Sequence, residues 1–233
     1  MAAEDIKRAL VTGSSSGIGL AIAQALLDRG WDVIGLDIAP ASLVHPAFSS
    51  TEVDLCDVGA TEHAVRSAGA VQALVHAAGV LRVGRLGDLA NEDSQLMWRL
   101  HVDAVTRIAN LVVPAMAQAK TGRVVLVGSR VARGMAGRSQ YAATKAALVA
   151  LARSWAAETA PAGVTVNVVS PAATETAMLA DPARATAPPK LPPLGRLIQP
   201  GEIAALVAFL LSPDAAAITG QDIQICGGAS LAA

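Results

Sequence analysis

The sequence has few of the residues and patterns that build metal centres, disulfide frameworks or membrane spans. Its 233 residues include 2 cysteines and 4 histidines. Cys56 and Cys226 stand outside any CxxC or Cys/His spacing, so we expect neither a disulfide framework nor a bound metal. The longest apolar runs, such as 203–211, fall well below the ~18 residues that a membrane-spanning helix needs. We therefore expect no membrane partner.

The chain also lacks an excess of either charge, with 18 basic and 19 acidic side chains and a formal net charge of −1. This balance gives no electrostatic reason to expect nucleic acid as a partner. The first residues, MAAEDIKRALV, are too charged for a signal peptide, so we expect a cytoplasmic protein. Hydrophobic residues make up 53% of the chain and charged residues 16%, which favours a large core and excludes the composition of disordered chains.

Short apolar or β-branched runs alternate with longer helix-period segments along most of the chain. The alternation predicts right-handed strand–helix–strand crossovers. We expect one α/β domain over residues 1–233, doubly wound, with a seven-stranded parallel sheet and helices on both faces. The expected strands are 9–12, 32–36, 50–53, 73–76, 124–127, 164–169 and 222–225, and the expected helices are 18–29, 93–118, 139–158 and 200–211. The proline-rich stretch within 177–195 predicts a substrate lid over the sheet edge.

A glycine-rich turn follows the first expected strand, with the sequence TGSSSGIG over residues 12–19. Glycine allows a tight turn and a close approach of backbone to a pyrophosphate, and the N–H groups of the following helix bind the negative charge. A serine-glycine turn without a ligand is the alternative. The strand before the turn and the amphipathic helix after it favour a dinucleotide site of Rossmann type.

Asp37 stands at the end of the second expected strand, 18 residues after Gly19. A carboxylate there accepts hydrogen bonds from both hydroxyls of the adenine ribose and repels a 2′-phosphate. The segment between Gly30 and Arg66 contains no arginine or lysine that would hold such a phosphate. The alternative is a solvated aspartate at a strand end. We expect the cofactor to be NAD in preference to NADP.

The single tyrosine of the chain, Tyr141, is followed four residues later by Lys145 on an expected helix. That spacing places both side chains on one face. A nearby ammonium favours the phenolate and lowers the pKa of a phenol, as proton transfer near neutral pH requires. Ser129, 12 residues before Tyr141, ends a strand where its hydroxyl can bind a substrate carbonyl. The alternative is an exposed structural pair, and the dinucleotide motif favours the catalytic interpretation.

Several motifs together resemble the short-chain dehydrogenase/reductase family, in that family's order and over nearly the entire chain. They are TGSSSGIG, Asp37, Asp54-Leu55, Ala77-Ala78-Gly79, Ser129, Tyr141-x-x-x-Lys145, Asn167 to Pro171, Thr176, Gly195-Arg196, Gly220-Gln221 and Gly227-Gly228. The resemblance implies that Tyr141 is the acid/base. It also implies that Lys145 lowers the pKa of the tyrosine and binds the nicotinamide ribose, and that Ser129 orients the reacting oxygen.

The same resemblance implies a cofactor site spread over the chain. Asp54 and Leu55 would face the adenine, and Ala78 and Gly79 would line a ribose. Thr174 and Thr176 would contact the carboxamide and diphosphate. The complete expected set is Gly13, Ser15, Ser16, Gly17, Ile18, Gly19, Asp37, Asp54, Leu55, Ala78, Gly79, Tyr141, Lys145, Pro171, Thr174 and Thr176.

His101 departs from the family pattern, because it occupies a place where the family usually has an asparagine that helps hold a proton-relaying water. An imidazole also donates and accepts hydrogen bonds, so His101 is included among the catalytic candidates with Ser129, Tyr141 and Lys145. Loss of the relay is the alternative, and it keeps open a non-catalytic dinucleotide-binding sensor or scaffold.

Arginines gather around the expected pocket, namely Arg82, Arg85, Arg130, Arg133 and Arg138. A guanidinium binds a carboxylate through two parallel hydrogen bonds, which favours an acidic substrate, and surface charges or subunit contacts are the alternative. The segments 77–84, 167–171 and 221–223 are also similar to 2,3-dihydro-2,3-dihydroxybenzoate dehydrogenases. That narrower resemblance implies oxidation of a carboxylated cyclic dihydrodiol.

We therefore expect an NAD(H)-dependent enzyme that transfers a hydride between nicotinamide and a secondary alcohol or ketone of a small-molecule substrate. A carboxylated cyclic dihydrodiol is one candidate substrate. The alternatives are a 3-oxoacyl or other ketone reductase using NAD(P)H, and the non-catalytic sensor. The apolar content of the expected helices 93–118 and 139–158 predicts a homo-oligomer, a dimer or a homotetramer.

Overall fold

The computed structural model describes residues 7–180 and 190–231. Seven parallel strands form one sheet in the order β3-β2-β1-β4-β5-β6-β7, which confirms the expected fold class. The strands are β1 (Arg8–Thr12), β2 (Asp32–Asp37), β3 (Phe48–Glu52), β4 (Ala73–His76), β5 (Gly122–Val127), β6 (Val164–Pro171) and β7 (Asp222–Ile225). Each expected strand agrees with the observed one to within two residues at either end.

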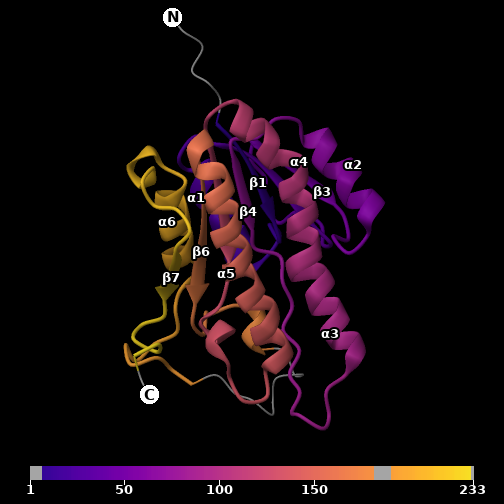
Figure 1. Ribbon diagram of the computed structural model, residues 1–233, viewed down its shortest axis with the longest axis vertical. Coiled ribbons are helices and arrows are strands. Elements are labelled where there is room, and N and C mark those ends of the chain that lie inside the picture. Colours follow the sequence, from indigo (N-terminus) through magenta and orange to yellow (C-terminus); the bar gives the residue numbers. More distant parts are fainter. Residues whose placement is uncertain (1–6, 181–189, 232–233) are drawn as a thin grey trace, which may run out of the picture.

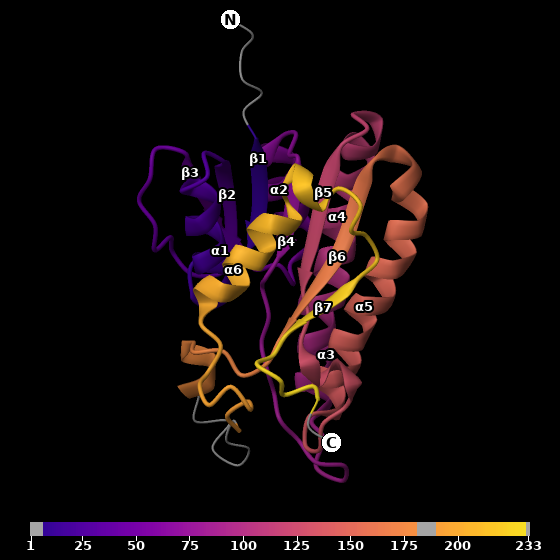
Figure 2. The same cartoon turned by 90° about the vertical axis from the view of Figure 1, so that its left-hand side faces the viewer.

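Helices cover both faces of the sheet (Figures 1 and 2). They are α1 (Gly17–Leu27), α2 (Val58–Ala68), α3 (Asn91–Trp98), α4 (Ala104–Gln118), α5 (Ser139–Thr159) and α6 (Pro200–Leu210). Buried residues of α2, α4 and α5 share one core with the strands, and those of α1 and α6 share the other. Along β5 the side chains alternate between these cores, because Val124 and Leu126 enter the first while Val125 and Val127 enter the second.

The expected continuous helix 93–118 is wrong. The helical region begins two residues earlier, at Asn91, and a π-helical turn, η1 (Arg99–Asp103), separates α3 from α4. The Ala104 N–H bonds to the Arg99 carbonyl, five residues back, so the turn contains one extra residue. That insertion turns His101 inward, where it is fully buried.

Helix α2 was not among the expected helices, although its boundaries carry recognisable signals. The Asp57 carboxylate accepts a hydrogen bond from the Ala60 N–H and caps the first turn. Gly69, with a φ of 70°, ends the helix. The helix is as long as α1 and α6 but less apolar, and its buried residues are only Thr61, Ala64 and Val65, so no run of large apolar residues indicates it in the sequence.

The carboxyl ends of the central strands meet at one edge and carry the chemistry-bearing loops. The glycine-rich turn follows β1, Asp37 ends β2, and Ser129 comes two residues after β5. The strand order reverses between β1 and β4, and ligands of doubly wound sheets bind at such a switch point. Among the described residues, no helix is long and apolar enough to cross a membrane.

A methyl group at Gly19 has no room, and this yields a test of the turn. A Cβ at Gly19 would overlap the Gly13 carbonyl, whereas a Cβ at Gly201, in the first turn of α6, has nothing within 4 Å. We expect Gly19→Ala to lower the free energy of unfolding by about 1–3 kcal/mol. Gly201→Ala, the control, leaves it unchanged or raises it slightly. Urea denaturation measures both, and equal effects would contradict the packing of the turn.

Candidate active site

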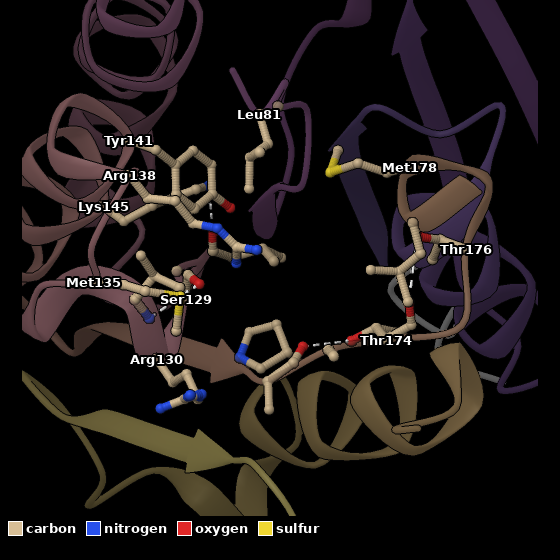
Figure 3. A pocket seen from close by; sticks show the side chains of 18 of the residues that line it. Leu81, Ser129, Arg130, Met135, Arg138, Tyr141, Lys145, Thr174, Thr176 and Met178 are labelled. Carbon is tan, nitrogen blue, oxygen red and sulfur yellow. Dashed lines mark hydrogen bonds between the residues drawn. The ribbon is translucent and has the colours of Figure 1, made fainter. Parts of the chain in front are cut away.

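A cavity of about 490 Å³ opens at this edge of the sheet. One side is built by the segment after β5 and the first turns of α5, and the other by the segment after β6 with the short helix η4 (Ala177–Ala180). Ser129, Tyr141 and Lys145 all line it. The structure therefore brings three of the four catalytic candidates into one cavity, with Thr174, Thr176 and Met178 on the opposite side (Figure 3).

Ser129 is held by the short helix that follows it, η2 (Arg130–Arg133). Its Oγ accepts a hydrogen bond of 3.2 Å from the Val131 N–H and caps that helix. Because the oxygen accepts from the backbone, the hydroxyl proton remains available for a ligand in the cavity.

Lys145 is buried beside Tyr141 and anchored to the sheet. Its Nζ donates to the Val127 carbonyl over 2.8 Å and lies 5.7 Å from the centroid of the Tyr141 ring. Burial lowers the pKa of Lys145 from 10.5 to about 8. The ammonium therefore still carries its charge at neutral pH, next to the phenol whose ionised form it favours.

His101 lies behind Tyr141 and is not among the residues that line the cavity. Its Nε2 accepts from the Val80 N–H at 3.0 Å, so Nδ1 carries the proton and donates to Thr144 Oγ1 at 2.8 Å. The Thr144 hydroxyl in turn donates to the Tyr141 carbonyl at 2.9 Å. Burial, with the charge of Lys145, lowers the pKa of His101 well below 6.5. The ring is neutral and connects three segments of the site.

A second buried histidine, His76, stands at the end of β4 and was assigned no role from the sequence. Thr12 Oγ1 accepts from the Ala77 and Ala78 N–H groups, so its proton goes to His76 Nδ1 at 2.9 Å. His76 therefore has the opposite tautomer to His101, with its proton on Nε2. Burial and then the charge of Lys145 lower the pKa of His76 to about 3. This side chain joins β1 to β4 beneath the glycine-rich turn.

The glycine-rich turn fits the diphosphate of a dinucleotide. Gly13 and Gly17 have φ angles of 69° and 53°, which favour glycine. Ser16, the N-cap of α1, makes no capping hydrogen bond through its side chain, and the first turn of α1 contains no acidic residue. The N–H groups of that turn are therefore available for an anion.

Asp37 organises the same turn from the end of β2. One carboxylate oxygen accepts from the Ser15 N–H at 2.8 Å and the other from the Ala39 N–H at 2.9 Å. The Ser15 hydroxyl donates to the Ala39 carbonyl at 3.1 Å. Each carboxylate oxygen can accept a further hydrogen bond. The side chain is therefore able to accept from the hydroxyls of a ribose bound beside the turn.

The other expected cofactor residues separate into two groups. Ile18, Gly79, Pro171, Thr174 and Thr176 line the cavity with Tyr141 and Lys145. The remaining residues do not line the cavity. They are Gly13, Ser15, Ser16, Gly17, Gly19, Asp37, Asp54, Leu55 and Ala78. Leu55 is 3% exposed and packs in the core, so its side chain does not reach a ligand.

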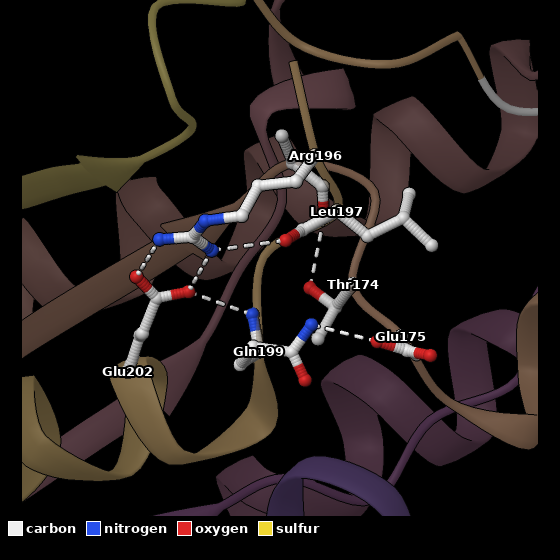
Figure 4. A network of polar contacts seen from close by, with 7 residues as sticks. Thr174, Glu175, Arg196, Leu197, Gln199 and Glu202 are labelled. Carbon is white, nitrogen blue, oxygen red and sulfur yellow. Dashed lines mark hydrogen bonds and ion pairs between the residues drawn. The ribbon is translucent and has the colours of Figure 1, made fainter. Parts of the chain in front are cut away.

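A polar network holds the segment after β6 against the start of α6 (Figure 4). Arg196 and Glu202 form a two-pronged ion pair with distances of 2.7 and 2.8 Å. This hydrogen bonding lowers the pKa of Glu202 to about 2. Gln199 donates through its side chain to Glu175 at 2.6 Å, and Thr174 pairs with Ile198 in an isolated β-bridge. The network therefore positions the two threonines expected to contact the cofactor.

The expected lid is described in part. Met178, Leu179 and Lys190 line the cavity, and residues 181–189 lie outside the described residues. Of the five arginines expected around the pocket, Arg130 and Arg138 line it, while Arg82, Arg85 and Arg133 do not. Arg82 instead pairs with Asp93 at 3.5 Å.

Comparisons with known proteins agree with this geometry. The family model described as enoyl-(acyl carrier protein) reductase matches residues 13–230. The chain is 36% identical to the 3-oxoacyl-[acyl-carrier-protein] reductase FabG of Vibrio harveyi over 236 residues, covering 95% of this chain and 96% of that protein.

Two solved structures are similar over nearly their whole length. A short chain dehydrogenase/reductase family protein superposes with a TM-score of 0.91 at 32% identity, covering 100% of both chains. A 3-ketoacyl-(acyl-carrier-protein) reductase from Brucella melitensis, complexed with NADH, gives 0.87 at 27% identity, covering 96% of this chain and 98% of that one. The chain therefore belongs to the short-chain dehydrogenase/reductase family of oxidoreductases.

Proposed function

We propose that this protein is an NAD(H)-dependent ketone reductase that forms a secondary alcohol, with Tyr141 as the proton donor. The observation that carries the proposal is that Ser129, Tyr141 and Lys145 line one cavity with Thr174 and Thr176. The 3-oxoacyl reductase names of the relatives favour this reaction over oxidation of a carboxylated dihydrodiol.

The residues divide the work of reduction between them. Nicotinamide, when bound, supplies the hydride to the carbonyl carbon. Ser129 donates a hydrogen bond to the carbonyl oxygen and orients it, and Tyr141 donates a proton to the same oxygen as negative charge develops there. Lys145 stabilises the phenolate that remains. Because Tyr141 and Lys145 are 9% and 4% exposed, little water competes for these hydrogen bonds.

Asp37 supports NAD as the preferred cofactor. Its carboxylate, at the end of β2, already accepts two backbone hydrogen bonds, and a 2′-phosphate beside it would face a fixed negative charge. The solved relatives do not decide between the two cofactors, because one is complexed with NADH and another, an actinorhodin polyketide ketoreductase, with NADPH; the proposal of NAD rests on Asp37.

His101 acts in this proposal as a positioning residue. Its two ring nitrogens are already engaged, by Val80 and by Thr144, and the ring meets Tyr141 edge-on with centroids 5.7 Å apart. The imidazole therefore fixes the backbone turn that carries the tyrosine. In this proposal, the presence of His101 in place of the family's asparagine does not favour the alternative that the protein is a non-catalytic dinucleotide-binding sensor.

Oligomerisation and location remain expectations from the sequence. Trp98, at the end of α3, is 45% exposed, and Leu111 and Val113 of α4 are only partly buried against the core. Such side chains fit a contact between copies of the chain. A homo-oligomeric, cytoplasmic enzyme is the simplest form of the proposal.

Tyr141→Phe tests the reaction directly. We expect the purified protein to oxidise NADH in the presence of methyl 3-oxobutanoate, a neutral ketone, as followed in the near ultraviolet. Removing the proton donor should lower kcat by about 10²–10⁴-fold while NADH still binds with similar affinity. An unchanged kcat would remove Tyr141 from the mechanism.

Asp37→Ala tests the cofactor preference. Loss of a charged acceptor should weaken NADH binding by about 10-fold or more and should narrow the gap between NADH and NADPH. Fluorescence titration gives both dissociation constants. Asp28→Ala removes the same charge from an exposed position at the other end of α1 and serves as the control. An NADH/NADPH ratio that does not move would contradict the ribose assignment.

His101 variants test the positioning role. Asparagine retains a donor and an acceptor, so we expect His101→Asn to keep kcat within about threefold, whereas His101→Ala loses about 10-fold. The pKa of His101 lies well below 6.5 because of burial, so the ring stays neutral as the pH falls toward 6. The acid limb of the pH–rate profile should therefore be the same in the wild type and His101→Asn. A limb that disappears in the asparagine variant would show that the imidazole itself exchanges protons.

A further inference from the structure

A polar network that starts on β7 takes no part in the reaction derived above. Its centre is the half-buried carboxylate of Asp222, the first residue of that strand. One carboxylate oxygen accepts from the Ser170 hydroxyl at 2.5 Å, and the other accepts from the side-chain amide of Gln224 at 2.9 Å. Because β7 pairs with β6 at the edge of the sheet (Figure 2), the two hydrogen bonds begin two branches that lead away from this edge.

The first branch ends at Gly128, the residue before Ser129. Ser170 is fully buried near the end of β6. A Cβ placed at Gly128 would lie 2.6 Å from Ser170 Oγ, so the Ser170 hydroxyl packs directly against this backbone. The Gly128 N–H also donates to the Val169 carbonyl at 2.8 Å. The bond to Asp222 fixes the rotamer of Ser170, and it therefore fixes the surface against which Gly128 packs.

The second branch ends at Arg130, the residue after Ser129. Gln224 Oε1 accepts from the Ser230 hydroxyl at 3.3 Å. The carbonyl of the preceding residue, Ala229, accepts from Arg130 Nη1 at 3.2 Å. Figure 3 shows the Arg130 side chain directed away from Tyr141, in agreement with this contact. The guanidinium therefore joins the start of η2 to the turn that follows β7.

Both branches depend on a side chain that has two acceptor oxygens. The Ser170 hydroxyl and the Gln224 amide each donate a proton to Asp222. An asparagine at this position would offer one acceptor oxygen and a donor amide, and an alanine would offer neither. Hydrogen bonds to a carboxylate are also shorter and stronger than those to a neutral acceptor. The aspartate is thus suited to hold both branches at once.

We infer that Asp222 is a positioning residue for Ser129, acting through Ser170 and Gln224 on the two residues that flank it. This inference rests on the proposed ketone reduction, in which the Ser129 hydroxyl binds the carbonyl oxygen. The Val131 N–H holds Ser129 Oγ within the segment, while the two branches hold the segment on the sheet. Asp222 does not line the cavity. Its effect on the rate is therefore exerted through the placement of the hydroxyl, to which the reaction is sensitive.

A double-mutant cycle tests whether Asp222 acts through Ser129. With NADH and methyl 3-oxobutanoate, we expect Asp222→Ala to lower kcat by about 10-fold. In the Ser129→Ala background, the same substitution should change the remaining rate by less than about twofold, because the hydroxyl that it positions is absent. Asp222→Asn, which keeps one acceptor, should lose less than Asp222→Ala. Asp214→Ala removes an exposed carboxylate before β7 and should leave kcat unchanged.

The outcomes separate this inference from the proposed function. Equal losses in the two backgrounds, or no loss in Asp222→Ala, would overturn the positioning role while ketone reduction stands. If the wild type does not reduce the ketone, the proposed reaction fails for this compound. In that case, or where Ser129→Ala has no measurable rate, hydrogen exchange followed by mass spectrometry decides the inference.

The exchange experiment uses the Val131 N–H, which donates to Ser129 Oγ. Asp222→Ala should speed exchange in the segment 128–133 by about 10-fold and leave exchange in α1 unchanged. An unchanged rate in that segment, or an equal increase in α1, would refute the positioning role. If Asp222→Ala does not fold, Ser170→Ala removes the first branch alone, and the same outcomes apply to it in both measurements.

Discussion

The hydrogen bond from Lys145 to the Val127 carbonyl is the contact on which the geometry of the site depends. It joins the second turn of α5 to the last residue of β5 over 2.8 Å in a buried setting. Tyr141 precedes Lys145 by one helical turn, and Ser129 follows Val127 by two residues. This contact therefore holds α5 against β5 beside both side chains, and the hydrogen bonds of Ser129 and Thr144 complete their placement. It also satisfies a buried ammonium that would otherwise destabilise the fold.

Burial keeps the two histidines near Lys145 neutral by lowering the pKa of each, and the charge of Lys145 adds to this effect. His76 and His101 reach the lysine from β4 and from the π-helical turn. The two rings carry their protons on opposite nitrogens. The His101 Nε2 accepts directly from the Val80 N–H. For His76, the Ala77 and Ala78 N–H groups donate to Thr12 Oγ1, whose own proton goes to the His76 Nδ1. Lys145 is therefore a cation beside two neutral rings, and its charge acts on the phenol together with that of Arg138, which lines the same cavity.

Much of this arrangement follows from the sequence, and the exceptions have identifiable causes. Short motifs predict the features that depend on local backbone geometry, namely the glycine-rich turn, Asp37 and the Tyr141–Lys145 spacing. The alternation of apolar runs and helical segments predicts the parallel sheet. The π-helical turn is different: one inserted residue leaves the apolar pattern of 93–118 nearly intact, so periodicity does not reveal it. The directions of the five arginines depend on tertiary packing. Arg133 and Arg138 are the same residue type in the same segment, yet Arg133 is exposed and Arg138 is buried.

The segment between Ser129 and Tyr141 allows specificity to change without moving the catalytic groups. Its ends are fixed, by the strand β5 with the cap on Val131 and by the first turn of α5. Between them, Gly134 and Gly137 adopt φ angles of 97° and 73° with open space around both, while Met135 packs against a buried cluster that includes Tyr141. Side chains on this segment reach either the cavity or solvent while Ser129 and Tyr141 stay in place. The residue types on this segment can therefore alter the lining of the cavity while the catalytic framework, which the rest of the sheet determines, stays the same.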